Sequence, residues 1–125
     1  MQAERVVREF WELMASNDFQ SVRRLLAPEF VAEWPQSGER IRGGERFARV
    51  NAEYPTKGRW SFIVNRLVSS DHDVVTQVSI TDGEQTAEPI SFFTVVHGKV
   101  TRLVEYWPEP FAPAANRRHL VELMW

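Results

Sequence analysis

Glu105 is the residue of this sequence best placed for acid or base chemistry. It lies in a run of alternating residues in which Leu103, Glu105 and Trp107 share one side of a predicted strand. If that side faces an apolar pocket, loss of hydration raises the pKa of the carboxyl group toward the range useful to a general acid or base. The alternative is a structural ion pair. The candidate partners for such a pair are Arg66, Arg102 and Arg118.

Other reactive residue types are sparse. The sequence has no cysteine, which excludes disulfides, thiolate ligands and cysteine nucleophiles. Its three histidines show no ligand spacing, so we predict no metal site. His72 and His97 fall in predicted turns, whereas His119 lies on a predicted terminal helix, either solvated or folded over a pocket mouth. Neither a dinucleotide-binding glycine motif nor a nucleophile elbow occurs, and we predict no cofactor.

The composition is that of one globular domain, predicted to span residues 1–125. The chain is 43% hydrophobic and 26% charged, and its net charge of −2 offers no basic footprint for nucleic acid or an anionic membrane. No apolar run is long enough to span a bilayer and the first residues lack a signal-peptide layout, so we expect a cytoplasmic protein. Fifteen aromatic residues, five of them tryptophan, favour an aromatic-lined cavity or a large interface.

The pattern of apolar residues changes along the chain from helical to extended. Helices are predicted over Val6–Met14 and Phe19–Leu26, with Pro28 ending the second, and over Glu45–Ala52 after a short strand at Phe30–Trp34. Beyond these, strands are predicted over 60–68, 74–81, 89–96 and 100–107, with turns at 69–73, 82–83 and 97–98 and a terminal helix over 114–124.

Helices followed by a four-stranded antiparallel meander predict an α+β fold, with the helices on one face of a curved sheet. Both faces of the strands carry apolar residues: Val74, Val78 and Ile80 share one side of a strand whose other side holds Val75. Only one face can pack on the helices, and an apolar outer face is typical of subunit contacts. We therefore predict a homodimer formed through the outer face of the sheet.

Three landmarks carry a resemblance to a known family: Phe10-Trp11-Glu12-Leu13 with Asn17-Asp18, the Pro35-to-Gly44 segment, and Gly98-Lys99-Val100 leading to Glu105-Tyr106-Trp107. They resemble the SnoaL-like, polyketide cyclase-like branch of the nuclear transport factor 2-like superfamily, which also contains ketosteroid isomerase, scytalone dehydratase and limonene epoxide hydrolase. The resemblance covers almost the whole chain. It implies a cone, in which a curved antiparallel or mixed sheet wraps around the N-terminal helices and leaves a pocket open at one end.

The resemblance argues against steroid isomerisation by the known machinery. The helix-one tyrosine of ketosteroid isomerase falls on Phe10, its general-base aspartate on Trp34 and its oxyanion-hole aspartic acid on Ser91. Phe10 cannot donate a hydrogen bond, and Trp34 cannot accept a proton at neutral pH. The Asp-Arg-Asp arrangement of the epoxide hydrolases has no counterpart either.

The same alignment implies an aromatic pocket with few polar groups, suited to a flat and mostly apolar small molecule. Cyclases of this type place an acidic residue on a late strand, roughly where Glu105 lies. Trp11, like Trp60, has a second interpretation as a core residue. The residues expected at the ligand are Phe10, Trp11, Met14, Trp34, Tyr54, Gln77, Ser79, Ser91, Phe93, Leu103, Trp107 and His119.

Three functions fit these observations. In the first, a cofactor-free isomerase, cyclase or dehydratase uses Glu105 to transfer a proton, with Gln77, Ser79 and Ser91 orienting substrate oxygens. In the second, a non-catalytic dimer captures an apolar metabolite, which the absence of the isomerase residues favours. In the third, the domain is a scaffold for protein interactions. The sequence leaves the choice open.

Overall fold

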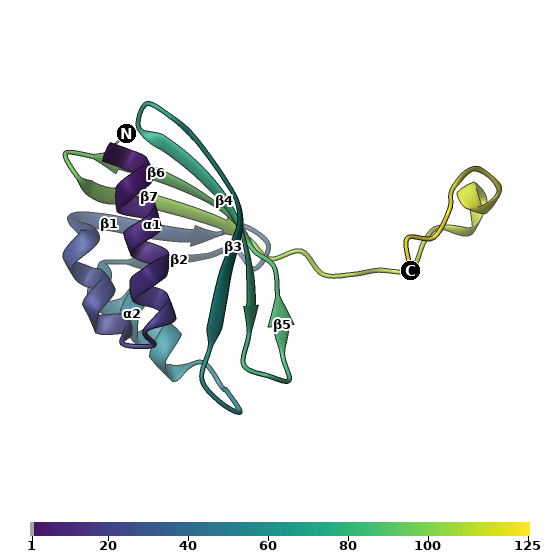
Figure 1. Cartoon of the computed structure of the whole chain (residues 1–125), viewed down its shortest axis with the longest axis horizontal. Coiled ribbons are helices and arrows are strands. Elements are labelled where there is room, and N and C mark those ends of the chain that lie inside the picture. Colours follow the sequence, from purple (N-terminus) through teal and green to yellow (C-terminus); the bar gives the residue numbers. More distant parts are fainter. Residues whose placement is uncertain (1) are drawn as a thin grey trace.

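The structure, a computed structural model, describes residues 2–125. The helices of its N-terminal half lie on one side of a curved sheet, and the C-terminal segment extends away from the body (Figure 1). The helical elements are α1 (Gln2–Ala15), the 3₁₀ helix η1 (Phe19–Leu25), α2 (Gly44–Glu53) and the 3₁₀ helix η2 (Ala115–Leu120). The strands are β1 (Leu26–Trp34), β2 (Glu39–Arg42), β3 (Ser61–Ser70), β4 (Asp73–Thr81), β5 (Thr86–Ala87), β6 (Ile90–Val96) and β7 (Lys99–Tyr106).

The sheet is mixed, and its strand order is β2-β1-β7-β6-β4-β3, with β5 paired to β4. Strands β3, β4, β6 and β7 form the predicted antiparallel meander, whereas β1 runs parallel to β7. The predicted α+β class, with N-terminal helices against a curved sheet, is confirmed. The parallel pair brings the end of β1 beside the end of β7, which places Trp34 near Glu105.

The predicted hairpin between β6 and β7 turns at His97 and Gly98. Both residues have positive φ, 50° and 76°, as the tight turns that match strand twist require. The predicted turn at Asp82-Gly83 joins β4 to β5, and Gly83 has φ of 102°, a backbone conformation that favours glycine. The turn chemistry of the sequence therefore sets the register of the strands that carry the site.

The first strand is longer than predicted. It starts at Leu26, because Pro28 is accommodated where the pairing of β1 with β7 shifts register between Leu26 and Val31. Strand β2 was not predicted. Its polar residues pair with β1 at the edge of the sheet, where Arg40 bonds to Glu33.

The core lies between the helices and the inner face of the sheet. Phe10 of α1 is fully buried, and its ring packs edge-on against Trp11 and against Phe93 of β6, with centroids 5.0 Å apart in each pair. Among residues 2–125, no helix combines the length and the apolar character needed to cross a membrane.

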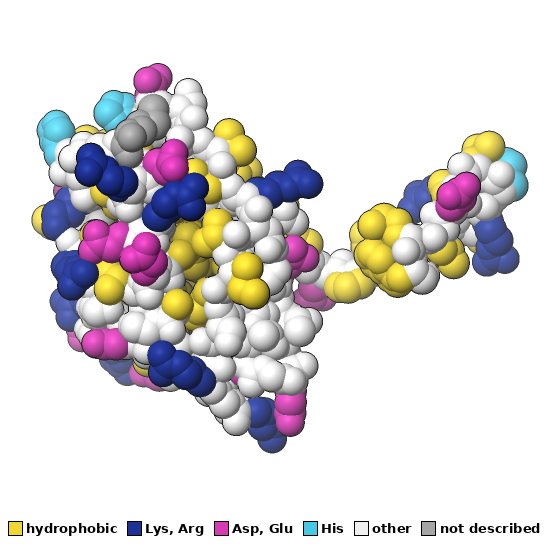
Figure 2. All heavy atoms as spheres, in the orientation of Figure 1, with side chains coloured by type: hydrophobic (Ala, Val, Ile, Leu, Met, Phe, Trp, Pro, Cys, Tyr) yellow, Lys and Arg dark blue, Asp and Glu magenta, His cyan; other side chains and the backbone are white. Residues whose placement is uncertain are grey.

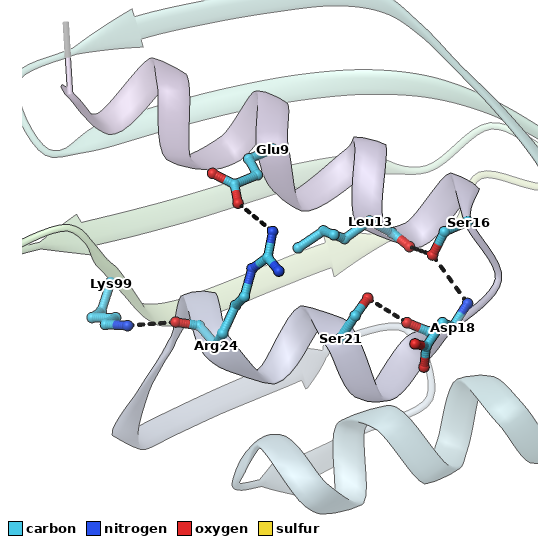
Figure 3. Close-up of polar contacts among 7 residues, drawn as sticks. All are labelled: Glu9, Leu13, Ser16, Asp18, Ser21, Arg24 and Lys99. Atoms are coloured by element: carbon cyan, nitrogen blue, oxygen red, sulfur yellow. Dashed lines mark hydrogen bonds and ion pairs between the residues drawn. The ribbon is translucent and has the colours of Figure 1, made fainter.

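Polar contacts fix the turn from α1 into η1 and anchor it to the sheet (Figure 3). The Ser16 hydroxyl accepts a hydrogen bond of 3.1 Å from the backbone N–H of Asp18. Arg24 of η1 forms an ion pair of 2.9 Å with Glu9 of α1, and its carbonyl accepts a hydrogen bond from Lys99 at the start of β7. These contacts hold the helices that form one wall of the cavity described below.

The predicted short C-terminal helix is confirmed, but it is the six-residue 3₁₀ helix η2 rather than a helix over the whole of 114–124. The chain around it leaves the body in an extended course (Figure 1). Every residue from 108 to 125 is exposed, so no tertiary packing stabilises a longer helix there. We call residues 108–125 the arm.

Candidate functional site

A cavity of about 400 Å³ lies among α1, α2 and the inner face of the sheet. This volume falls in the range of small-molecule sites. Most of its walls are aromatic or aliphatic side chains. The lining residues are Trp11, Met14, Phe19, Trp34, Phe47, Val50, Asn51, Tyr54, Trp60, Phe62, Ile80, Gln85, Thr86, Ala87, Glu88, Glu105, Trp107, Pro108, Glu109 and Pro110.

Glu105 is the buried carboxyl group of this cavity, with 4% of its surface exposed. Its Oε1 accepts a hydrogen bond of 3.0 Å from the indole N–H of Trp34, and its Oε2 accepts one of 2.8 Å from the hydroxyl of Ser91. Trp34 reaches it from the end of β1, and Ser91 lies directly opposite it on β6. Three strands therefore position one carboxyl group.

None of the ion pairs within residues 2–125 involves Glu105. Arg102 bonds to Glu33 instead, because the two side chains lie on the outer side of neighbouring strands. Arg66 is exposed and Arg118 lies on the arm. The structural ion pair considered for Glu105 is therefore absent from the described residues.

Burial raises the pKa of Glu105 above its ordinary value, and the hydrogen bonds from Trp34 and Ser91 oppose that shift only in part. The charged form loses its hydration in the cavity wall, and no cation of residues 2–125 pairs with it. An elevated pKa brings the group closer to neutrality, where a carboxyl can both release and accept a proton.

The two hydrogen-bond partners of Glu105 differ in what they can do. The indole N–H of Trp34 only donates, so Oε1 is an acceptor in either protonation state. The hydroxyl of Ser91 can donate to the carboxylate or, after rotation, accept from a proton on Oε2. The site therefore keeps both hydrogen bonds when Glu105 gains or loses a proton, which suits a group that cycles between the two states.

Aromatic rings form the walls around this carboxyl group. Trp34 and Trp107 pack edge-on with ring centroids 6.0 Å apart, and Tyr54 and Trp60 form a second such pair at 5.8 Å. Trp11 forms part of the floor, and its indole N–H donates to Thr76 at 3.2 Å. Such surfaces favour flat, mostly apolar ligands.

Asp82 ties together two loops at the rim of the cavity. Its carboxylate accepts backbone N–H bonds from Lys57, Glu84 and Gln85 at 2.7–2.9 Å, and these bonds hold the pKa of Asp82 well below its usual range. The Gln85 side chain, which lines the cavity, also donates to the carbonyl of Pro55. The turn after β4 is thus fixed to the loop that follows α2.

The structure brings about half of the predicted ligand-contact residues to the cavity. Trp11, Met14, Trp34, Tyr54 and Trp107 line it together with Glu105. Ser91 lies behind the wall, in contact with Glu105. Phe10, Phe93 and Leu103 are core residues without a surface on the cavity.

The placement predicted for Gln77 and Ser79 is wrong. Thr76 is the β4 residue directly opposite Ser91, so the alternation of side chains turns Gln77 and Ser79 to the outer face. There the Gln77 amide donates to Glu88, and the Ser79 hydroxyl accepts from Asn65. These two residues cannot orient a ligand in the cavity.

The predicted position of His119 over the pocket mouth is also wrong, since it lies on η2 in the exposed arm. Several lining residues were not predicted. Phe47 and Val50 precede the predicted Tyr54 by seven and four residues, a helical spacing that could have found them. Trp60, expected in the core, is half-buried and lines the cavity.

Within residues 2–125, no group of three or more His, Asp or Glu side chains could hold a metal ion.

The sequence matches the SnoaL-like domain family over residues 7–103, and the chain belongs to this family. No curated protein matches it. A protein of Kribbella flavida DSM 17836, provisionally assigned as a ketosteroid isomerase, is 32% identical over 98% of this chain and 90% of its own, with a TM-score of 0.89.

Two further solved structures are similar. An NTF-2 like protein of unknown function from Burkholderia xenovorans LB400 is 24% identical over 99% of this chain and 96% of its own, with a TM-score of 0.80. An LEH-like epoxide hydrolase of M. tuberculosis is 26% identical over 86% of this chain and 83% of its own, with a TM-score of 0.67. The resemblance found in the sequence landmarks is thereby confirmed at the level of family and fold.

Proposed function

We propose that this protein is a cofactor-independent acid–base catalyst acting on a flat, mostly apolar small molecule, with Glu105 transferring a proton next to a carbonyl group. The observation that carries the proposal is the buried carboxyl group of Glu105 in an aromatic cavity, with two hydrogen-bond donors and no ion-pair partner within the described part of the chain. The family includes isomerases and cyclases, which agrees with such chemistry.

The proposed reaction is a pair of proton transfers. The Glu105 carboxylate removes a proton from the carbon beside the carbonyl, which leaves an enolate, and the neutral acid then returns the proton to another carbon or to a leaving oxygen. Ser91 changes from donor to acceptor as the proton arrives on Oε2. The side chains of Asn51 and Tyr54, both on the cavity wall, are the candidates to bond the substrate oxygen.

The proposal differs from the machinery of ketosteroid isomerase. Phe10, Trp34 and Ser91 occupy the positions aligned with its three acidic or phenolic groups. In this chain, Trp34 and Ser91 both donate to Glu105 instead. The 32% identical relative supports the choice of an isomerase-type reaction, whereas the identity of the proton-transferring group rests on the contacts of Glu105.

Deuterium exchange tests proton transfer without knowledge of the natural substrate. Cyclic ketones and enones are incubated with the protein in D₂O, and loss of the proton beside the carbonyl is followed by NMR. We expect exchange catalysed by the wild type to fall by about 10²-fold or more in Glu105→Gln, since general acid–base groups contribute that much. Glu109→Gln is the matched control, because Glu109 lines the same cavity but is exposed.

Thermal shifts with the same compounds separate the remaining alternatives. A ligand at about a hundredfold excess over Kd stabilises the protein by roughly 2.7 kcal/mol. Stabilisation without exchange would contradict catalysis and establish the non-catalytic binder, while neither effect would favour the interaction scaffold. The absence of a cofactor, the cytosolic location and the dimer through the outer sheet face stay predictions from the sequence.

A further inference from the structure

The arm carries large apolar side chains that contact little of the body. It leaves the end of β7 and extends away on the side opposite the helices, and its hydrophobic side chains stand clear of the body (Figures 1 and 2). Phe111, Leu120 and Trp125 are 84%, 77% and 95% exposed. An extended segment of this composition has too few contacts of its own to hold a course in water, so it needs a surface to pack on.

The body offers an apolar surface without a partner, the outer face of the sheet. A row across four strands contains Val68, Val75, Phe92 and Val104, each directly opposite the next. Val68 is 66% exposed, and Ile63, nearer the start of the same strand, is 64% exposed. The Phe92 ring also packs edge-on against Tyr106, which is partly exposed at the end of β7.

We propose that the arm packs on the outer sheet face of a second copy of this chain, so that two chains exchange arms in a dimer. The arm begins at Pro108, two residues after Tyr106 of that face, and extends away on the side of the body opposite the helices. A second copy that covers the outer face is therefore the body that the arm meets. The chain itself supplies both the apolar arm and the apolar surface that receives it.

The length of the arm fits this arrangement. Its first seven residues, 108–114, span at most about 25 Å when extended. A body of about 100 residues has a radius of gyration of about 13 Å. The arm is therefore long enough to place η2 and the residues after it against a second body that lies next to its own.

The area available is also sufficient. An aromatic side chain buries about 150–250 Å², so Phe111 and Trp125 from two arms supply roughly 600–1,000 Å². Leu120, Leu123 and Met124 of each arm add to this total, together with the surface they cover. Specific interfaces bury about 1,200–2,000 Å².

The similar structures indicate that the arm is a feature of more than one chain. The Kribbella flavida structure aligns over 98% of this chain with a TM-score of 0.89, which leaves only two or three of the 125 residues outside the alignment. The alignment therefore includes the arm. A C-terminal segment that aligns between two chains 32% identical is consistent with a constant packing partner, and a second copy is the partner always present.

Arm exchange also affects the cavity. Only this connection between the dimer and the cavity rests on the proposed function. Pro108, Glu109 and Pro110 at the base of the arm line the cavity. An arm seated on a partner holds those three residues in place, so the dimer fixes this part of the cavity wall. Oligomeric state is measured without ligand, so the dimer and the proposed function can fail separately.

Sedimentation equilibrium of the 125-residue chain tests arm exchange. The arm variant Phe111→Asp/Leu120→Asp and the face variant Ile63→Asp/Val68→Asp change side chains that are exposed in one chain, so neither should unfold the body. We expect the wild type to be a dimer and both variants to be monomers, with Kd raised at least about 100-fold. The control Ala112→Asp/Asn116→Asp adds the same charge to the arm at small or polar positions and should remain dimeric.

Mixing the two variants identifies which surfaces meet. A heterodimer of one arm-variant chain and one face-variant chain retains one intact arm on one intact face, so the mixture should dimerise more tightly than either variant alone. A monomeric wild type, a dimeric arm variant or a mixture that dimerises no better than its components would each overturn the proposal. Circular dichroism confirms that every variant is folded.

Discussion

The hydroxyl of Ser91 lies 2.8 Å from Oε2 of Glu105, directly across the pairing of β6 with β7. Both side chains point to the inner face, and the same cross-strand row continues to Thr76 on β4. A polar row thus crosses the core side of the sheet, and only Glu105 in it can carry a charge. The energetics of this contact depend on the protonation state of the carboxyl group.

The first prediction concerns Ser91→Ala. Loss of the hydroxyl removes a donor from the Glu105 carboxylate, and hydrogen bonds to charged groups contribute roughly 1.5–3 kcal/mol, about twice the value of neutral ones. We expect the free energy of unfolding to fall by about half that amount at pH 4, where the raised pKa keeps Glu105 neutral, and by more at pH 8 as the carboxylate becomes populated. Urea denaturation at the two pH values measures the difference.

Thr76→Val is the control for Ser91→Ala. It removes a hydroxyl from the same polar row and leaves the indole N–H of Trp11 without its acceptor, but no ionisable group is involved. Its cost, about 1–3 kcal/mol, should not change with pH. An equal loss at both pH values for Ser91→Ala would contradict the charge-dependent contact.

The second prediction follows from the raised pKa of Glu105. Relative to the unfolded chain, where its ordinary value is 4.5, the folded protein binds this proton more tightly. The stabilisation that the folded protein gains by binding this proton is therefore complete at pH values below the pKa of Glu105 in the unfolded chain. It is lost as the pH rises through the pKa of Glu105 in the folded protein. In Glu105→Gln, whose amide matches the neutral acid, stability should decline less over that window. The slopes should differ by at most about 1.4 kcal/mol per pH unit, the value for one proton.

The measurement is urea denaturation of wild type and Glu105→Gln from pH 4 to pH 8. Glu109→Gln, at an exposed position of the arm, controls for loss of a negative charge and should run parallel to the wild type. A wild-type stability that rises relative to Glu105→Gln as the pH increases would show that the carboxylate, rather than the acid, is favoured by folding.

Much of the fold follows from local sequence. The period-two alternation over β3, β4, β6 and β7 and the turns at Asp82-Gly83 and His97-Gly98 act over a few residues, and the structure confirms them. The parallel pairing of β1 with β7 joins segments about 70 residues apart, and no local pattern encodes it. The apolar spacing of residues 114–124 predicts a longer helix than the six residues of η2, because spacing carries no information on whether a surface is present to pack against.

The candidate site likewise has features that local sequence predicts and features that depend on pairing between distant strands. Glu105 was identified because strand alternation places it on the side of Leu103 and Trp107. The error at Gln77 and Ser79 arose because a face is assigned by register between strands, and a shift of one residue exchanges the two faces. That Trp34 donates to Glu105 depends on the parallel pair, so it could not be predicted from either segment alone.

The third prediction concerns Trp34→Phe. The substitution keeps an aromatic ring near Trp107 but removes the indole N–H that donates to Oε1 of Glu105. That bond lowers the pKa of Glu105, so its loss should raise the pKa further. Carbon-13 NMR titration of the labelled carboxyl group measures the change directly.

Trp60→Phe is the matched control for Trp34→Phe. Trp60 lines the same cavity, and among the hydrogen bonds of residues 2–125 its indole N–H donates to no side chain or carbonyl. We expect the pKa of Glu105 to be unchanged in this variant. A similar upward shift in both variants would show that the hydrogen bond from Trp34 is not the cause of the effect.

The fourth prediction concerns Asp82 at the cavity rim. Backbone N–H groups of Lys57, Glu84 and Gln85 lower the pKa of Asp82 from its ordinary value of 3.8, so the stabilisation it provides is present above that value and is lost as the pH falls toward the folded pKa. Asp82→Asn, which cannot accept all of these bonds, should lower Tm at pH 6 and approach the wild type below about pH 4. Calorimetry measures both, with the exposed Asp71→Asn as control. A deficit in Tm that persists unchanged at pH 3 would show that the carboxylate charge does not hold the rim.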